Sequence, residues 1–215
     1  MTEEWEDRWQ HGRTGWDQSG AHPALVDLLI GESRGKVELP SSGKAVVPGC
    51  GRGYDVDLLA KTGLDALGVD ISPTGVAEAQ RWLGTQPVSP GEGSRAVIVA
   101  DYFAWAKSVQ GDWDVLLDYT FLCALPPSLR GQWAATFALL ARPAPSTRLI
   151  TLMYPLHPTP LPEADHPPYP LSEEEYHRLL DERWELVYCE PVKPEWKRTV
   201  GAPGGEKVGV WAWRA

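Results

Sequence analysis

The sequence predicts an α/β fold, a doubly wound and mostly parallel sheet of seven strands with helices on both faces. Apolar runs of strand length alternate with segments of helical pattern over most of the chain. Glycine, proline and serine stand at the junctions between these segments. The length of 215 residues suits a single domain with a substantial core, so we expect one domain over 1–215.

The first half of the chain alternates between helical and strand patterns. Strands are predicted at 44–50, 65–70 and 96–100, and helices at 23–30, 54–61 and 72–83. Ser72 and Pro73 are typical of a helix start, with a capping side chain followed by proline in the first turn. Gly63 is a typical helix stop, and residues 86–94 read as a loop rich in proline and glycine.

The second half continues the alternation and ends in two strands. Strands are predicted at 113–119, 148–154, 184–190 and 208–213, and helices at 127–141 and 172–184. Ser172 is predicted to begin the last helix, where it forms a capping box with Glu175. Residues 155–170 contain too many prolines for a regular element. Because no clear helix joins the last two strands, we expect them to pair antiparallel at one edge.

Composition and charge favour a small-molecule partner. The net charge is −9 and no Lys/Arg cluster appears, which disfavours nucleic acid because phosphate neutralisation supplies most of that affinity. No apolar run reaches the roughly 18 residues of a membrane helix, and the acidic N-terminus is no signal peptide. Three scattered cysteines predict no disulfide framework. We therefore expect no membrane partner, reduced thiols and a cytoplasmic setting.

The first predicted strand ends in a glycine-rich segment, 49–53. In open α/β sheets, ligands bind beyond the carboxyl ends of the strands, near the point where the strand order reverses. Gly49 and Gly51 would let the backbone approach a ligand closely at the start of the next helix. Asp70 ends the second strand, 21 residues after Gly49, where an acid can accept hydrogen bonds from two ribose hydroxyls.

Acidic and aromatic residues also follow the third and fourth strands. Asp101 can accept a hydrogen bond from an exocyclic adenine amine, and Tyr102 can cover the ring. Asp118 lies where a reacting group would sit. A dinucleotide site is the competing interpretation, but its G-x-G-x-x-G fingerprint would need glycine where Tyr54 stands. The pattern suits S-adenosylmethionine better.

Six segments of the sequence resemble the family of thiopurine, thiol and halide methyltransferases. They are WEDRWQHGRTGWDQSG, VVPGCGRGYDVDLLA, GVDIS, ADYFAW, LLDYTFLCALPP and LITLMYP. The resemblance covers most of the chain, is weakest at 83–94 and after 155, and is closest to the thiol, thiocyanate and halide branch. Arg52 and Tyr54 depart from it, because plant halide and thiol enzymes tend to have glycine and histidine there. These departures leave the expected cofactor binding intact and the acceptor open.

The resemblance implies a Rossmann-like class I methyltransferase that binds S-adenosyl-L-methionine. Residues 1–20 would fold over the cofactor, and we call them the N-terminal cover. Gly49 would then meet the methionine part, Asp70 the ribose, and Asp118 the methionine amine. The residues implied to bind the cofactor are Trp5, Trp9, Trp16, Gly49, Gly51, Asp70, Asp101, Tyr102 and Asp118. A sulfonium cation is well placed near aromatic faces.

The expected acceptor is a small thiol, thiocyanate or halide, because a soft anion needs little or no general base. Tyr119 and Tyr154 would line its pocket, and the substrate-side loop, residues 155–170, would lie over it. No side chain is assigned as a catalytic base, and no ligand spacing predicts a metal. Two alternatives stay open: O- or N-methylation of a small metabolite, and a non-catalytic S-adenosylmethionine-binding regulator.

The same residues also have plain structural interpretations. Trp5 and Trp9 would anchor a helix to the core, and Asp101 and Asp118 would be loop acids. The three cysteines are expected to be packing residues.

Overall fold

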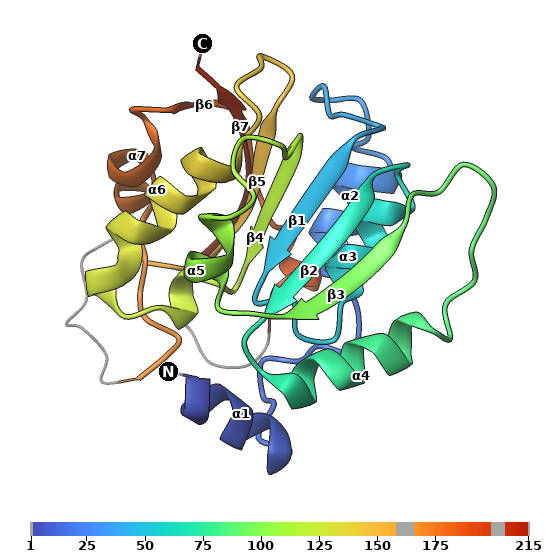
Figure 1. Ribbon diagram of the computed structural model, residues 1–215. Helices are drawn as coiled ribbons and strands as arrows, with labels where there is room; N and C mark the ends of the chain where they lie inside the picture. The colour runs from blue at the N-terminus through green and yellow to red at the C-terminus, as the bar shows by residue number, and fades with distance from the viewer. Residues whose placement is uncertain (1, 158–165, 199–204, 215) are drawn as a thin grey trace.

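A computed structural model describes residues 2–157, 166–198 and 205–214, whose strands form one seven-stranded sheet in the order β3-β2-β1-β4-β5-β7-β6 (Figure 1). The strands are β1 (Lys44–Pro48), β2 (Asp65–Asp70), β3 (Arg95–Val99), β4 (Val115–Tyr119), β5 (Arg148–Leu156), β6 (Trp184–Pro191) and β7 (Gly205–Trp213). Strands β1 to β5 pair in parallel, whereas β7 is antiparallel to both β5 and β6. The predicted fold class and the antiparallel edge are both confirmed.

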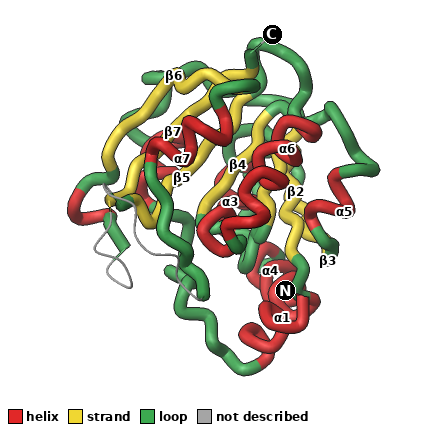
Figure 2. Tube along the Cα trace, turned by 90° about the vertical axis from the view of Figure 1, so that its left-hand side faces the viewer, coloured by secondary structure: helices red, strands yellow, loops and turns green. Residues whose placement is uncertain are grey.

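Helices cover both faces of the sheet. One face carries α2 (Pro23–Ile30), α3 (Tyr54–Ala60) and α4 (Pro73–Leu83), and the other carries α5 (Tyr102–Ala106), α6 (Arg130–Leu140) and α7 (Glu173–Leu180) (Figure 1). Short 3-10 turns lie at Leu122–Ala124, Pro127–Leu129 and Pro194–Trp196. The first helix, α1 (Thr2–Gln10), lies beyond the carboxyl ends of the strands and packs against α4 (Figures 1 and 2).

The chain reverses direction across the sheet between β1 and β4. From β1 it winds outward through β2 to β3, then returns to β4 and winds outward the other way. Ligands of open α/β sheets bind at such a switch point, beyond the carboxyl ends of the strands. The central strand β5 is buried at all nine positions, as expected for a strand with helices on both sides.

Proline affects the strands less than the sequence predicts. The irregular segment was expected to begin at Pro155, but β5 continues through Pro155 to Leu156. Its register against β7 shifts between Met153 and Leu156, so the missing amide hydrogen of Pro155 falls at a break in the ladder. Residues 158–165 of the substrate-side loop lie outside the described part of the chain.

Two predicted helices are shorter than expected, and the short helix α5 was not predicted. The helix expected over 172–184 ends at Leu180, because Trp184 instead pairs with Trp213 in the sheet. The helix expected over 127–141 begins as a 3-10 turn and becomes α6 at Arg130. The unpredicted helix, α5, has only five residues, too few to show a helical period. No helix in the described residues has the length and apolar character needed to cross a membrane.

A buried carboxylate joins β4 to α6. Asp118 is 1% exposed and accepts hydrogen bonds from Trp133 Nε1 at 2.7 Å and from the Leu122 amide at 3.1 Å. Burial raises the pKa of Asp118 to about 6, although both hydrogen bonds oppose the rise. Buried charge is tolerated only when such donors are present, so the indole of Trp133 is expected to stabilise the fold.

We therefore predict that Trp133→Phe destabilises the protein more than Trp113→Phe does. Trp133→Phe removes a donor to a buried carboxylate, a loss of about 1.5–3 kcal/mol in addition to packing. Trp113 is a matched control because it is also buried, but its indole Nε1 has no hydrogen-bond partner among the described residues. Urea unfolding at pH 7 measures both variants, and equal losses would show that the bond to Asp118 contributes nothing.

Candidate active site

A cavity of about 370 Å³ lies beyond the carboxyl ends of the strands, at the switch point. Its walls come from the N-terminal cover, from the ends of β1 to β5, and from segments near residues 167 and 198. Nine of the residues expected from the sequence border it: Trp5, Trp9, Trp16, Gly49, Gly51, Asp70, Asp101, Tyr102 and Tyr154. The fold thus brings these predicted residues, of which Trp5 and Tyr154 are 149 positions apart, to one space.

The glycine loop follows β1 and turns beneath the cavity. Gly49 has φ of +57°, and a Cβ atom there would lie 2.7 Å from the ring of Phe121, so only glycine fits without a shift. The Gly51 amide donates to Asp70 Oδ2 at 2.9 Å, and the Ser72 amide donates to Asp70 Oδ1 at 2.9 Å. Each oxygen keeps further acceptor capacity toward the cavity that Asp70 borders.

Burial and hydrogen bonds have opposite effects on the pKa of Asp70. The residue is 8% exposed, and burial raises the pKa of its carboxyl, while the hydrogen bonds from Ser72 and Gly51 oppose the rise. A carboxylate held in this way is ready to accept hydrogen bonds from the hydroxyl groups of a ligand.

The residues after β3 form another wall of the cavity. Asp101 is exposed and caps α5 by accepting a hydrogen bond from the Ala104 amide at 3.1 Å. Tyr102 is 4% exposed and packs edge-on against Phe121, with ring centroids 5.3 Å apart. The Tyr102 hydroxyl is buried, and no described protein group is its hydrogen-bond partner. Burial raises the pKa of this phenol well above its ordinary value, so it remains a neutral wall.

The three tryptophans of the N-terminal cover gather into one cluster. The ring of Trp16 meets Trp5 at 5.3 Å and Trp9 at 5.7 Å between centroids, edge-on in both cases. Trp9 is 7% exposed and packs so closely on α4 that a Cβ atom at Gly75 would lie 2.9 Å from its Nε1. The cluster therefore does two things: Trp9 anchors α1 to α4, and all three tryptophans border the cavity.

Glu6 fastens α1 to the start of α4. Its carboxylate accepts hydrogen bonds from Ser72 Oγ at 2.5 Å, Thr74 Oγ1 at 2.6 Å and the Thr74 amide at 3.1 Å. The hydrogen bonds from Ser72 and then Thr74 lower the pKa of Glu6 to about 2. A negative charge is also favoured at the N-terminus of a helix, so Glu6 holds the cover against the sheet in its ionised form.

Arg198 brings a positive charge to the opposite wall, near Tyr154. Its guanidinium lies 5.0 Å from the ring centroid of Tyr154 and 5.4 Å from that of Tyr119. Its Nη2 donates to the carbonyl of Trp16, whereas its Nε is buried without a hydrogen-bond partner among the described residues. The sequence analysis missed Arg198, because a single arginine in an irregular segment carries no periodic signal.

Thr120 and Phe121 are two further lining residues that the sequence analysis missed. Thr120 follows β4 with φ of +63°, a conformation that costs a non-glycine residue about 1–3 kcal/mol and is concentrated at functional sites. The signal in the sequence was their position directly after a predicted strand, the same signal that identified Asp70 and Asp101.

Two expected site residues do not reach the cavity. Asp118 lies behind the wall, where Trp133 and Leu122 occupy its carboxylate, so the structure does not bring it to a ligand amine. Tyr119 stands behind Arg198, and its ring meets His22 edge-on at 5.4 Å between centroids. No group of three or more His, Cys, Asp or Glu residues in the described ranges is arranged to hold a metal ion.

The sequence is similar to thiol and thiopurine methyltransferases. The family model described as thiopurine S-methyltransferase matches residues 1–201. A probable thiol methyltransferase 2 from Arabidopsis thaliana is 35% identical over 176 residues, covering 82% of this chain and 70% of the relative. Thiocyanate methyltransferase 1 from the same plant is 34% identical over 185 residues, with the same coverage. A thiopurine S-methyltransferase from Xanthomonas campestris is 33% identical over 199 residues, covering 88% and 86%.

The fold is similar to that of solved methyltransferases. A Burkholderia thailandensis 1,6-didemethyltoxoflavin N1-methyltransferase, solved with S-adenosylhomocysteine, has a TM-score of 0.70 at 18% identity and covers 100% of this chain and 87% of its own. The Synechocystis magnesium protoporphyrin IX methyltransferase with bound S-adenosylmethionine has a TM-score of 0.66 at 16% identity, covering 100% and 97%. At these identities the likeness concerns the fold.

We predict that Glu6→Gln loosens the cover, because an amide offers one acceptor oxygen where Glu6 uses two. The folded-state pKa of Glu6, about 2, lies below its ordinary value of 4.5. Its stabilising effect is therefore fully present above pH 4.5 and lost as the pH falls toward 2.

Unfolding free energies of the wild type and Glu6→Gln, followed by tryptophan fluorescence, should differ at pH 6 and converge as the pH falls from about 4.5 to 2. Glu4→Gln is the matched control, because Glu4 lies on the same helix and bonds only to Arg8 among the described residues. A difference that stays constant over this pH range would contradict the assigned role of Glu6.

Proposed function

The chain belongs to the thiopurine S-methyltransferase family, and on that premise we propose that it transfers a methyl group from S-adenosyl-L-methionine to a small thiol, thiocyanate or halide. The observation that carries the proposal is the cavity at the switch point. Trp5, Trp9, Trp16 and Asp70 border it together with Arg198, so aromatic, acidic and cationic walls meet in one space.

The cofactor half of the cavity fits S-adenosyl-L-methionine in the chemistry of its walls. The Asp70 carboxylate has acceptor capacity left for ribose hydroxyls. The backbone at Gly49 and Gly51 offers close approach, and the tryptophan rings suit a sulfonium cation. Asp101 and Tyr102 are proposed to meet the adenine. Since Asp118 lies behind the wall, we do not assign the methionine amine to it.

When bound, S-adenosyl-L-methionine supplies a methyl group activated by a sulfonium sulfur. The protein's contribution is to hold the acceptor in line with that group and to exclude water. The N-terminal cover supplies the tryptophans on one side, and Pro167 and Pro168 of the substrate-side loop border the other. No covalent intermediate with the protein is needed.

The acceptor half favours a small anion. The Arg198 guanidinium, stacked on the aromatic rings of Tyr154 and Tyr119, attracts negative charge to this wall. Among the described lining residues, the carboxylates belong to Asp70 and Asp101, which we assign to the cofactor. The acceptor would therefore arrive already ionised, as thiocyanate and halides do and as a thiol does in part at neutral pH.

Cys123 borders the same half of the cavity and is itself a thiol. Burial raises its pKa to about 12, so the group stays protonated and does not compete for the methyl group.

The proposal extends to the setting of the reaction. A cytoplasmic location agrees with the free thiols at Cys50, Cys123 and Cys189, and a net charge of −9 argues against nucleic acid as acceptor. We also propose that residues 1–215 form one domain, with the N-terminal cover at 1–20 and the substrate-side loop at 155–170.

We predict that sulfur acceptors are the best substrates. The assay combines labelled S-adenosylmethionine with separate sets of thiols, sulfide, thiocyanate, iodide, catechols, amines and carboxylates. Turnover of a thiol should rise with pH toward its pKa of about 8.5, because the thiolate fraction rises. Turnover of thiocyanate or iodide should be nearly flat over the same range.

An oxygen or nitrogen acceptor that is tenfold more efficient, about 1.4 kcal/mol in barrier, would refute the assignment of acceptor and favour O- or N-methylation. Binding of S-adenosylmethionine without turnover of any set would instead indicate a non-catalytic regulator.

We also predict that Asp70→Ala weakens cofactor binding by roughly ten- to a hundredfold, since a hydrogen bond to a charged group contributes about 1.5–3 kcal/mol. Calorimetry with S-adenosylhomocysteine on the folded variant measures this. Asp65→Ala is the matched control, because Asp65 begins the strand that Asp70 ends and bonds to Ser94, away from the cavity. Unchanged affinity in Asp70→Ala would remove Asp70 from the site.

A further inference from the structure

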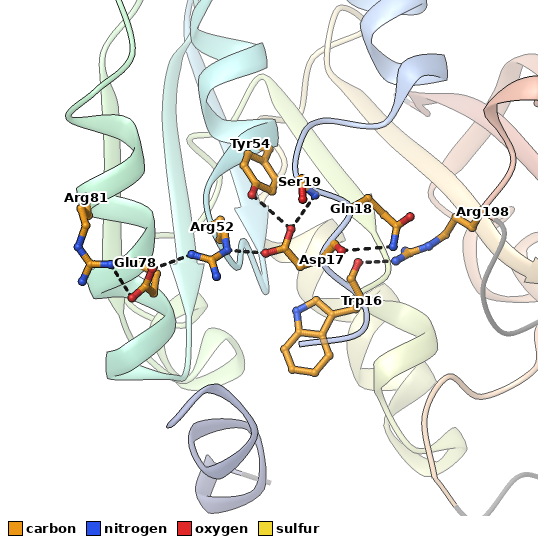
Figure 3. Close-up of polar contacts among 9 residues, drawn as sticks. All are labelled: Trp16, Asp17, Gln18, Ser19, Arg52, Tyr54, Glu78, Arg81 and Arg198. Carbon is orange, nitrogen blue, oxygen red and sulfur yellow. Dashed lines mark hydrogen bonds and ion pairs between the residues drawn. The ribbon is translucent and has the colours of Figure 1, made fainter. Parts of the chain in front are cut away.

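Arg52, in the loop after β1, contacts three separate segments of the chain at once. Its Nε donates to the carboxylate of Asp17, and its Nη1 donates to Glu78 of α4 at 2.6 Å (Figure 3). Its guanidinium also lies 5.4 Å from the ring centroid of Trp9 on α1. Arg52 therefore joins the glycine loop, α4 and two parts of the N-terminal cover.

Asp17 is the residue of the N-terminal cover that forms an ion pair with Arg52. Besides Arg52, its carboxylate accepts hydrogen bonds from the Tyr54 hydroxyl at 3.2 Å and from the Ser19 amide at 2.8 Å (Figure 3). The Asp17 side chain is 13% exposed, so this is a partly buried network. The preceding residue, Trp16, borders the cavity and meets both Trp5 and Trp9.

The backbone of Trp16 is also held from the other side. Its carbonyl accepts a hydrogen bond from Arg198, which borders the acceptor half of the cavity (Figure 3). Trp16 is thus held directly by Arg198, and it is held by Arg52 through its neighbour Asp17. These two contacts, together with the contacts of the Trp16 ring with Trp5 and Trp9, restrict where the ring lies, which lowers the entropy lost when a ligand binds.

Arg52 does not itself border the cavity, so its effect on the ligand is indirect, and its side-chain contacts with Asp17 and Trp9 direct that effect to the cover. An isolated surface ion pair contributes little to global stability. Here the arginine bridges two carboxylates from different segments, and its planar group donates to both in directions that a lysine ammonium does not reproduce. Its removal should release the cover locally rather than unfold the domain.

Resting on the proposed function, we propose that Arg52 is a positioning residue for the methyl transfer, which holds Trp16 through Asp17 and supports Trp9 directly in the wall of the cofactor site. Tyr54 assists through the same carboxylate.

The experiment compares Arg52→Gln, Arg52→Lys and Asp17→Asn with the control Arg81→Gln. Arg81 also bonds to Glu78, at 2.6 Å, but its side chain is 67% exposed and it bonds to no described residue of the cover. Calorimetry measures S-adenosylhomocysteine binding, steady-state kinetics give separate KM values for cofactor and acceptor, and thermal unfolding reports global stability.

We expect Arg52→Gln to weaken S-adenosylhomocysteine binding about tenfold, with the acceptor KM changed less than about twofold and thermal stability close to that of Arg81→Gln. Arg52→Lys should recover part of the affinity, because it restores the charge but not the two-sided contact. Asp17→Asn should weaken binding similarly, and combining it with Arg52→Gln should add little, since both act through one contact.

Cofactor affinity in Arg52→Gln and Asp17→Asn within twofold of Arg81→Gln would overturn the proposal and make the network a surface ion pair only. If Arg52→Gln does not fold, Arg52→Lys and Asp17→Asn decide by the same criterion. Failure of the wild type to bind S-adenosylhomocysteine would refute the proposed function itself, and the wild-type titration separates that result from a failure of the inference about Arg52.

Discussion

The architecture of the cavity depends on the hydrogen bonds that the Asp70 carboxylate accepts. One oxygen accepts from Gly51 of the glycine loop, and the other accepts from Ser72 at the start of α4. Ser72 in turn caps α4 through the Gly75 amide and donates its hydroxyl hydrogen to Glu6 of α1. The end of β2 therefore sets the positions of a loop, a helix and the N-terminal cover.

The N-terminal cover is held by two arginines from distant segments. The carbonyl of Trp16 accepts a hydrogen bond from Arg198, and the carboxylate of the next residue, Asp17, accepts one from Arg52 (Figure 3). Trp16, which borders the cavity, thus lies between these two contacts. A site that must exclude water around a reactive group benefits from a cover fixed in this way.

Much of the fold was predictable because its signals are local. The bounds of α2, β2 and α4 agree with prediction, since apolar spacing, Ser72 and Pro73 act within a few residues. The predictions that failed concern junctions. Pro155 was expected to end the fifth strand, but β5 continues through it because the register against β7 shifts there. Trp184 was expected to lie at the end of a helix, but it pairs with Trp213 in the sheet. Both outcomes depend on a strand distant in sequence.

The sequence alone determined the fold class, the family resemblance and three residues at or just after the strand ends, Gly49, Asp70 and Asp101, because parallel strands bring their carboxyl ends to one edge. Only the tertiary structure decided that Asp118 turns into the core toward Trp133, that Arg198 borders the cavity, and that Arg52 and Tyr54 hold Asp17. The physical reason is range. Strand ends are marked by local pattern, whereas a hydrogen bond between residues 35 or 182 positions apart leaves no mark in either segment.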